Sequence, residues 1–242
     1  MAFTATAGGA APLAVVIPCL EEARRLPLLL ADLAAAPVGL VAELVVVDGG
    51  SADGSATLAR LAGATVLEGA IGRGAQLRCG VAASTAPWLL LLHADARLPS
   101  GWGGAVAAAM AAADPRAPSA WCFELAVAAA GPMLRGLELA VSWRTRLRQL
   151  PYGDQGLLLP RALLERCGGI APLPLMEDLD LVLRLRQQAR IRSLGLPLRV
   201  DGRRWRRHGV LGTAWRNAAL RRAWRRGGSP MQLARLYYDR SC

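Results

Sequence analysis

The chain has 242 residues, of which 53% are hydrophobic and 19% charged, so it can bury a substantial core, and disordered and fibrous classes are excluded. The formal net charge is +11, and all 29 basic residues are arginine. The strongest apolar run, residues 88–92, is far shorter than the roughly 18 residues that a membrane-spanning helix needs.

The charge is distributed unevenly. Sixteen arginines lie between Arg184 and the C-terminus against only Asp201 and Asp239, whereas residues 1–183 carry slightly more acids than bases. A basic segment of this kind favours an anionic partner, which could be a membrane surface, a phosphorylated substrate or nucleic acid. No basic stretch precedes the first apolar residues, so we expect no signal peptide and a cytoplasmic location.

In the first half of the chain, apolar runs alternate with helical patterns. Residues 13–17, 44–47 and 88–92 are continuous apolar runs, typical of strands buried on both faces of a parallel sheet, and residues 64–67 predict another strand. Helical spacing covers 21–36, and further helices are expected after the second and third strands. This alternation predicts βαβ units, hence an α/β, Rossmann-like fold with a mainly parallel sheet.

The second half shows a different order of elements. A strand is predicted over 121–127, a helix over 133–148, a short strand over 157–159, a helix over 160–167 and another helix starting at 176–180. The turn Tyr-Gly-Asp-Gln-Gly precedes the short strand. This half looks like an acceptor-side addition to a nucleotide-binding first half.

No internal repeat or linker divides the chain, so we expect a single domain over residues 1–242. Within it, residues 13–115 form the predicted nucleotide-binding half and 116–200 the acceptor-side half. Residues 201–242 form a helical, arginine-rich C-terminal extension.

Polar residues follow the predicted strands at the places where ligands bind in open α/β sheets. Pro18 and Glu22 follow the first strand, and Asp48, at the end of the second, could accept hydrogen bonds from a base or ribose. Asp95 ends a very apolar strand and should have a cation as partner. Mg²⁺ or Mn²⁺ beside a diphosphate is such a cation, and His93 could add a ligand.

Two further groups could take part in chemistry. Arg73 lies in a Gly-Arg-Gly turn before a helix that carries Gln76, and its guanidinium could bind a diphosphate through two hydrogen bonds. Glu177, Asp178 and Asp180 open another helix, where their charges favour the helix dipole. They exceed what capping needs, so one of them is a candidate general base.

These motifs occur in a recognisable order: AVVIPCLEEA, LVVVDGGSADGS, LLLLHADARLP, YGDQG and PLMEDLDLVLRLR. In this order they resemble the family 2 glycosyltransferases of the GT-A fold. With the segment GRRWRRHGV and the closing LARLYY, the chain is also similar to a bacterial subgroup, the arsenosugar-biosynthesis-associated glycosyltransferases. The resemblance extends over about residues 13–239.

The resemblance implies inverting transfer of a hexosyl or pentosyl group from a nucleotide-diphosphate sugar, expected to be a UDP-sugar, to a small-molecule or lipid acceptor. It makes Asp178 the general base and Asp95 the residue on the divalent metal, Mg²⁺ or Mn²⁺. His93 stands where the family has the first Asp of its metal motif. The implied donor-side residues are Pro18, Glu22, Asp48, Ser51, Arg73, Gln76 and Asp95, and the implied acceptor-side or sugar-side residues are Asp154, Gln155, Glu177 and Trp205.

Two other classes of protein are alternatives. A nucleotidyltransferase shares the nucleotide-binding fold but has a glycine-rich, arginine-containing loop directly after the first strand, where this chain has PCLEE at 18–22. A non-catalytic arginine-rich module could bind nucleic acid through Trp205, Trp215 and Trp224, but no recognised nucleic-acid motif accompanies them. We therefore expect no nucleic-acid partner.

A membrane role is compatible with catalysis. Residues 213–226 predict a basic helix with Trp215 and Trp224 tending to one side, which could lie on an anionic bilayer and make the protein peripheral to the cell membrane. Packing of this helix against the catalytic domain with its arginines outward is the alternative interpretation.

Overall fold

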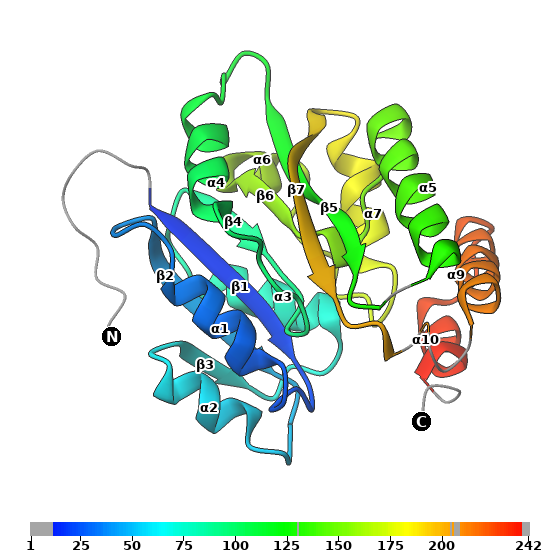
Figure 1. The fold of residues 1–242 in the computed structure, drawn as a ribbon, viewed down its shortest axis with the longest axis horizontal. Coiled ribbons are helices and arrows are strands. Elements are labelled where there is room, and N and C mark those ends of the chain that lie inside the picture. Colours follow the sequence, from blue (N-terminus) through cyan, green and yellow to red (C-terminus); the bar gives the residue numbers. More distant parts are fainter. Residues whose placement is uncertain (1–11, 130, 204, 206–208, 239–242) are drawn as a thin grey trace.

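The computed structural model describes residues 12–129, 131–203, 205 and 209–238. Its core is a seven-stranded sheet in the order β3-β2-β1-β4-β6-β5-β7 (Figure 1). The strands are β1 (Leu13–Cys19), β2 (Val41–Asp48), β3 (Thr65–Glu68), β4 (Trp88–Leu91), β5 (Ser119–Val127), β6 (Leu157–Pro160) and β7 (Arg190–Val200).

Helices cover both faces of this sheet (Figure 1). They are α1 (Leu26–Ala34), α2 (Ser55–Leu61), α3 (Arg73–Ala82), α4 (Trp102–Ala111), α5 (Pro132–Arg148), the 3-10 helix η1 (Gly153–Gln155), α6 (Arg161–Arg166), α7 (Glu177–Leu185), α9 (Val210–Arg225) and α10 (Pro230–Tyr238). The prediction of an α/β fold with a mainly parallel sheet is confirmed.

The strand directions determine where a site can form. β3, β2, β1 and β4 are mutually parallel, and β6 is antiparallel to both β4 and β5. Because β6 is antiparallel to both β4 and β5, β5 runs in the same direction as β4. β7 is parallel to β5 and therefore runs in this direction too. The carboxyl ends of β1, β2, β4, β5 and β7 therefore share one edge of the sheet, although they come from both halves of the chain.

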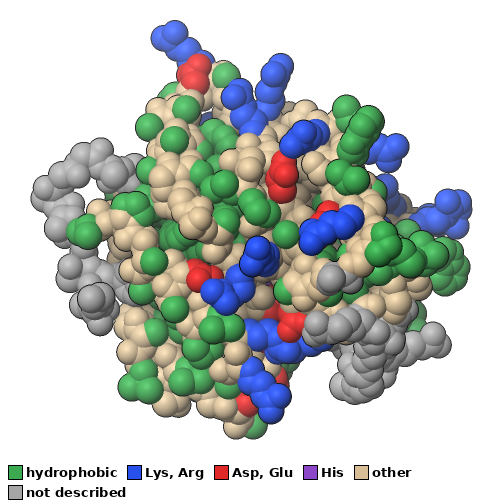
Figure 2. Space-filling view, viewed as in Figure 1, with side chains coloured by type: hydrophobic (Ala, Val, Ile, Leu, Met, Phe, Trp, Pro, Cys, Tyr) green, Lys and Arg blue, Asp and Glu red, His purple; other side chains and the backbone are tan. Residues whose placement is uncertain are grey.

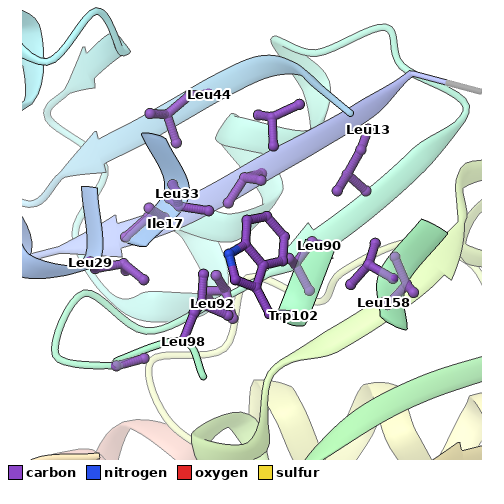
Figure 3. Close-up of a cluster of buried hydrophobic side chains, with 14 of the residues drawn as sticks. Leu13, Ile17, Leu29, Leu33, Leu44, Leu90, Leu92, Leu98, Trp102 and Leu158 are labelled. Carbon is purple, nitrogen blue, oxygen red and sulfur yellow. The ribbon is translucent and has the colours of Figure 1, made fainter. Parts of the chain in front are cut away.

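Strand periodicity divides the core between the two faces of the sheet. On β1, Leu13, Val15 and Ile17 pack with α1 and α4, while Ala14 and Val16 pack on the opposite face with α3, α6 and α7. Figure 3 shows the first cluster, in which Trp102 of α4 lies among leucines from the strands and α1. Because both faces are covered, the central strands read as continuous apolar runs.

The predicted strands are present, with small shifts at their ends, but the helix predicted over 21–36 begins only at Leu26. Residues 21–23 instead donate backbone hydrogen bonds to the loop after β2. β7 and α4 were not predicted from sequence, whereas α9 and α10 lie in the extension that was predicted to be helical. β7 is an edge strand with alternating exposure and a register shift opposite β5, so its sequence, RIRSLGLPLRV, has no apolar run.

Candidate active site

A cavity of about 160 Å³ opens at the shared carboxyl edge of the sheet. Its polar lining comes from loops that are far apart in sequence: Asp95 follows β4, Asp154 lies in η1, Asp178 begins α7 and Asp201 follows β7. The remaining lining residues are Arg73, His93, Tyr152, Leu175, Met176, Leu179, Val200, Arg203, Trp205, Asn217, Leu220, Arg221 and Tyr237. Acidic and basic side chains thus face one enclosed space, which is typical of a site that binds a polar ligand.

Asp178 is held at the cavity wall by backbone donors. Its Oδ2 accepts a hydrogen bond from the Gly153 N–H at 2.8 Å, and its Oδ1 accepts one from the Leu179 N–H at 2.7 Å. A Cβ at position 153 would lie 2.7 Å from His93 Nε2 and 3.3 Å from Asp178 Oδ2, so only glycine allows this approach. Gly153 therefore brings His93, after β4, close to Asp178 at the start of α7.

Asp154 contributes a buried carboxylate oxygen. Its Oδ1 is inaccessible to solvent and has no hydrogen-bond donor among the described residues. Burial raises the pKa of Asp154, Arg144 opposes this rise, and the charges of Asp178 and Asp95 add to it. A buried oxygen without a donor, near two other carboxylates, is suited to meeting a cation or a substrate hydroxyl.

The carboxylates do not form a complete metal centre by themselves. Within the described ranges, no three His, Cys, Asp or Glu side chains gather closely enough to hold an ion. Mg²⁺ and Mn²⁺ prefer oxygen ligands, and Mg²⁺ is usually held by one or two carboxylates together with substrate phosphates and water. Asp95 and the buried Asp154 oxygen therefore provide a donor set that fits such an ion.

Arg73 is fixed by a buried acid. Its Nε lies 2.9 Å from Glu177 Oε1, and the Glu177 side chain is only 1% exposed. Burial raises the pKa of Glu177 to about 7, although the Arg73 charge opposes the rise. Arg73 is placed there because Gly74 packs against the carbonyl groups of Ala171 and Leu173, where a Cβ would lie 2.5 Å from both oxygens.

Beside the cavity, a network of ion pairs joins the loop after β1 to the end of β7. Glu22 pairs with Arg25 and with Arg203, and Arg25 also pairs with Asp201. Burial alone would raise the pKa of Asp201, but hydrogen bonds from the Arg203 backbone and the Arg25 side chain outweigh it and lower that pKa. Glu22 thus contacts the lining residue Arg203 directly and is linked to the lining residue Asp201 through Arg25.

Tyr152 lies between two guanidinium groups. Arg144 of α5 is 3.7 Å from the centre of its ring and Arg221 of α9 is 4.8 Å from it, both at cation–π distance. Arg144 also donates to the Leu150 carbonyl at 2.8 Å. Burial lowers the pKa of Arg144. This stack attaches the basic helix α9 to the loop that carries Asp154.

Of the twelve site residues predicted from sequence, five line the cavity. A sixth, Glu22, pairs with the lining residue Arg203. Arg73, Asp95, Asp154, Asp178 and Trp205 line the cavity directly. Trp205 also packs against the cluster around Leu125 and Val200. Neighbouring residues 204 and 206–208 of the motif GRRWRRHGV lie outside the described residues.

Asp48 and Ser51 lie at the same sheet edge but do not line the cavity. Asp48 is 1% exposed; its Oδ2 accepts from the N–H groups of Gly50 and Ser51 at 3.0 and 2.7 Å, and its Oδ1 accepts from Ser51 Oγ at 2.6 Å. Ser51 Oγ in turn accepts from the Glu21 N–H at 2.8 Å. In this structure both residues shape the turn after β2.

Pro18, Gln76, Gln155 and Glu177 are buried outside this cavity, which corrects their predicted placement. Pro18 lies within β1, and Gln76 Nε2 donates to the carbonyl groups of Cys19 and Val47 at 2.8 Å each, tying the ends of β1 and β2. Gln155 Nε2 donates to the Phe123 carbonyl at 3.0 Å. Their amides satisfy buried backbone groups, which pattern alone does not distinguish from ligand contacts.

Sequence reasoning missed several lining residues, among them Tyr152, Asp201, Asn217 and Arg221. Tyr152 precedes the YGDQG glycine and could have been found as part of that motif. Asp201 could have been found only if β7 had been predicted, because it then follows a strand end like Asp48 and Asp95. Asn217 and Arg221 depend on how α9 packs, which no local pattern indicates.

Known proteins resemble this chain in sequence and in fold. Residues 14–123, from β1 into β5, match the family described as glycosyl transferase family 2. The sequence is 42% identical over 88 residues to uncharacterised glycosyltransferases of Mycobacterium bovis and Mycobacterium tuberculosis, a match that covers 36% of this chain. It spans about 38% of the length of those relatives.

Solved structures share the fold. Glucosyl-3-phosphoglycerate synthase from M. tuberculosis, in complex with Mn²⁺, UDP and glucosyl-3-phosphoglycerate, aligns with TM-score 0.55 and 20% identity over 77% of this chain and 71% of its own. TarS of S. aureus, in complex with UDP-GlcNAc, aligns with TM-score 0.62 and 16% identity over 78% of this chain and 58% of its own. Residues 14–123 therefore resemble glycosyl transferase family 2, and the fold of the chain is GT-A.

Proposed function

We propose that this protein is an inverting glycosyltransferase that moves a sugar from a nucleotide-diphosphate donor to a hydroxyl group of a small-molecule or lipid acceptor. One observation carries the proposal: Asp95, Asp154 and Asp178, from three segments far apart in sequence, converge with Arg73 on a single cavity at the carboxyl edge of the sheet. The match of residues 14–123 to glycosyl transferase family 2 supports the same reaction class.

Asp178 is the proposed general base. In a single displacement, the acceptor oxygen bonds to the anomeric carbon, the bond to the diphosphate breaks and the hydroxyl proton passes to a carboxylate. Asp178 suits this step because it lines the cavity and its Oδ2 is held by the Gly153 N–H at 2.8 Å. Removal of the proton by a positioned base contributes roughly 10² to 10⁴ in rate.

Asp95, with the buried Oδ1 of Asp154, is the proposed place for Mg²⁺ or Mn²⁺. The M. tuberculosis synthase has been crystallised with UDP and either ion. When bound, the ion offsets negative charge on the leaving diphosphate. Arg73, oriented by Glu177, adds a fixed positive charge on the same side of the cavity.

UDP-sugars are the proposed donors, since both structural neighbours named above have been crystallised with UDP or UDP-GlcNAc. Asp48 and Ser51 order the turn after β2 at the same edge of the sheet. Their proposed role is to hold the donor-side loop in place, without lining the cavity themselves. The arsenic-linked acceptor suggested by the subgroup resemblance stays a prediction.

Thermal unfolding with UDP, GDP and dTDP, each with and without Mn²⁺, tests the donor class, because a ligand that binds the native state raises the melting temperature. We expect UDP with Mn²⁺ to give the largest shift and UDP alone a smaller one. Release of free UDP from UDP-glucose, UDP-galactose or UDP-GlcNAc then tests turnover. If no nucleotide stabilises the protein with or without metal, the proposed function is wrong.

A further inference from the structure

Helix α5 presents an unusual amount of apolar surface to solvent. Met133, Leu139, Trp143 and Leu147 are 50%, 63%, 66% and 72% exposed, and they recur along one side of the helix at spacings of four to six residues. The opposite side, with Leu134 and Val141 among others, is buried against the domain. An amphipathic helix with an exposed apolar side normally has a partner for it.

Helix α9 extends this surface. It contacts α5, and its Leu211 and Trp215 are 72% and 76% exposed. Figure 2 shows hydrophobic side chains gathered along the edge of the molecule where α5 and α9 lie in Figure 1. We call Met133, Leu139, Trp143, Leu147, Leu211 and Trp215 the α5–α9 apolar face. Trp224 is not part of it, because it packs inward, so the prediction that Trp215 and Trp224 share a side is wrong.

The charges around the face have one sign. Arginines are exposed on both helices, at positions 135, 146 and 148 on α5 and at 222 and 225 on α9. The sequences of α5, α9 and α10 contain a single acid, Glu138, which is 13% exposed, pairs with Arg135 and accepts from the Val127 N–H. The exposed apolar residues therefore lie within an almost purely cationic border.

We propose that the α5–α9 apolar face docks onto the surface of a bilayer that contains anionic lipids. Tryptophan and leucine on a helix bordered by arginine suit the boundary between acyl chains and headgroups, and arginine adds attraction to anionic lipid. A second copy of the chain fits less well, because face-to-face pairing would bring two arginine borders together. In the part of the chain that the structure describes, no helix is long and apolar enough to cross a membrane.

The docking surface also has a defined relation to the cavity. On α9, Leu211 and Trp215 point away from the domain, whereas Asn217, Leu220 and Arg221 line the cavity from the opposite side of the helix. A docked α9 would thus hold the cavity about one helix diameter, roughly 10 Å, from the bilayer surface. The docking itself does not depend on the reaction proposed for the cavity.

Co-sedimentation of the full chain with vesicles tests the proposal. We expect binding to phosphatidylcholine vesicles that contain phosphatidylglycerol, little binding to pure phosphatidylcholine, and weaker binding as salt is raised. The double variant Trp143→Ala/Trp215→Ala should bind at least about tenfold more weakly. The matched control is Leu61→Ala/Ile71→Ala, which removes two residues that are 79% and 86% exposed elsewhere.

Melting curves of both variants check that they are folded, and light scattering reports the oligomeric state. The proposal is overturned if the wild type does not bind the anionic vesicles, if it binds both vesicle types equally, or if the control weakens binding as much as the tryptophan pair. A dimer that the tryptophan pair dissociates would make the face a contact between copies and would also overturn it.

Discussion

The loops after β1 and β2 differ from the segment around η1 and α7 in what their carboxylates contact. Asp48 and Asp53 direct their oxygens at backbone N–H groups and hydroxyl groups of the same two loops. Among the described residues, Asp154 instead has a buried oxygen without a donor, and the buried Glu177 pairs with Arg73. Buried polar groups normally have hydrogen-bond partners. The loops after β1 and β2 are therefore a structural framework, whereas the segment around η1 and α7 leaves polar groups available to a ligand.

The two regions also differ in their ties to the rest of the molecule. The loops after β1 and β2 are held to each other and to α3 through Gln76. The second region depends on arginine contacts between distant elements, such as the stack of Arg144, Tyr152 and Arg221. We therefore expect substitutions in the first region to change stability and those in the second to change activity.

Asp178→Asn should have the largest effect on activity. The amide keeps the size of the side chain but cannot take the acceptor proton, so kcat should fall by roughly 10² to 10⁴ while UDP binding is retained. Steady-state transfer kinetics and calorimetric titration with UDP measure the two quantities. Asp180→Asn is the matched control, because Asp180 begins the same helix and pairs with Arg184 at 2.6 Å away from the cavity. Undiminished kcat in Asp178→Asn would refute its role as base.

Asp95→Asn should have the next largest effect, which is on UDP binding. Loss of the charge that faces the metal should weaken UDP binding in the presence of Mn²⁺ by about tenfold to a hundredfold, with little change when Mn²⁺ is absent. Titrations with and without the ion give the ratio. Asp114→Asn, in the loop after α4, serves as control and should leave the ratio intact. Equal weakening in both conditions would show that Asp95 acts on the nucleotide without metal.

Glu177 gives a pH test of the buried ion pair. Its pKa is about 7 in the folded protein against 4.5 ordinarily, so between these values the folded state holds a proton that the unfolded state has lost. Stability should therefore fall as pH rises from about 4.5 to 7 and stay level above, by an amount on the order of 3 kcal/mol. Glu177→Gln cannot titrate and should lack this fall.

Denaturant unfolding of both proteins at pH 5 and pH 8 measures the difference. The raised pKa of Asp154 acts in the same direction, but it is common to both proteins and cancels in the comparison. If wild type and Glu177→Gln lose the same stability between the two pH values, Glu177 is charged throughout and the assignment of its pKa is wrong.

The framework was more predictable from sequence than the site. Strands β1, β2 and β4 are buried on both faces, so each is a continuous apolar run, and the polar residues after β4 and at the start of α7 could be assigned to one edge. For this reason Asp95 and Asp178 were predicted at the edge where the structure has them lining the cavity, and their chemical roles stay predictions. Gln76 and Gln155 were misplaced, because an amide that satisfies a buried carbonyl and an amide that binds a ligand have the same local pattern.

The residues that sequence reasoning missed share a cause. Asp201 follows an edge strand whose arginines, Gly195 and Pro197 hide the alternation, and Arg221 reaches the cavity only through the packing of α9 on Tyr152. Both depend on contacts between elements more than 60 residues apart in sequence. The spacing of residues along the chain carries no information about such contacts. The ends of predicted strands are informative, because the carboxyl ends of parallel strands lie at one edge of the sheet.

Gln76→Leu tests the framework itself. Leucine fills a similar volume but leaves the Cys19 and Val47 carbonyl groups without the two hydrogen bonds of 2.8 Å that now join the ends of β1 and β2. Each bond contributes about 1 kcal/mol, so the free energy of unfolding should fall by roughly 1 to 3 kcal/mol. Gln187→Leu, an exposed position after α7, should change it by less than about 0.5 kcal/mol. If the predicted donor contact of Gln76 were correct, UDP affinity would fall while stability stayed level. The buried position of Gln76 favours the reverse, because its amide can reach the nucleotide only by giving up both of these hydrogen bonds.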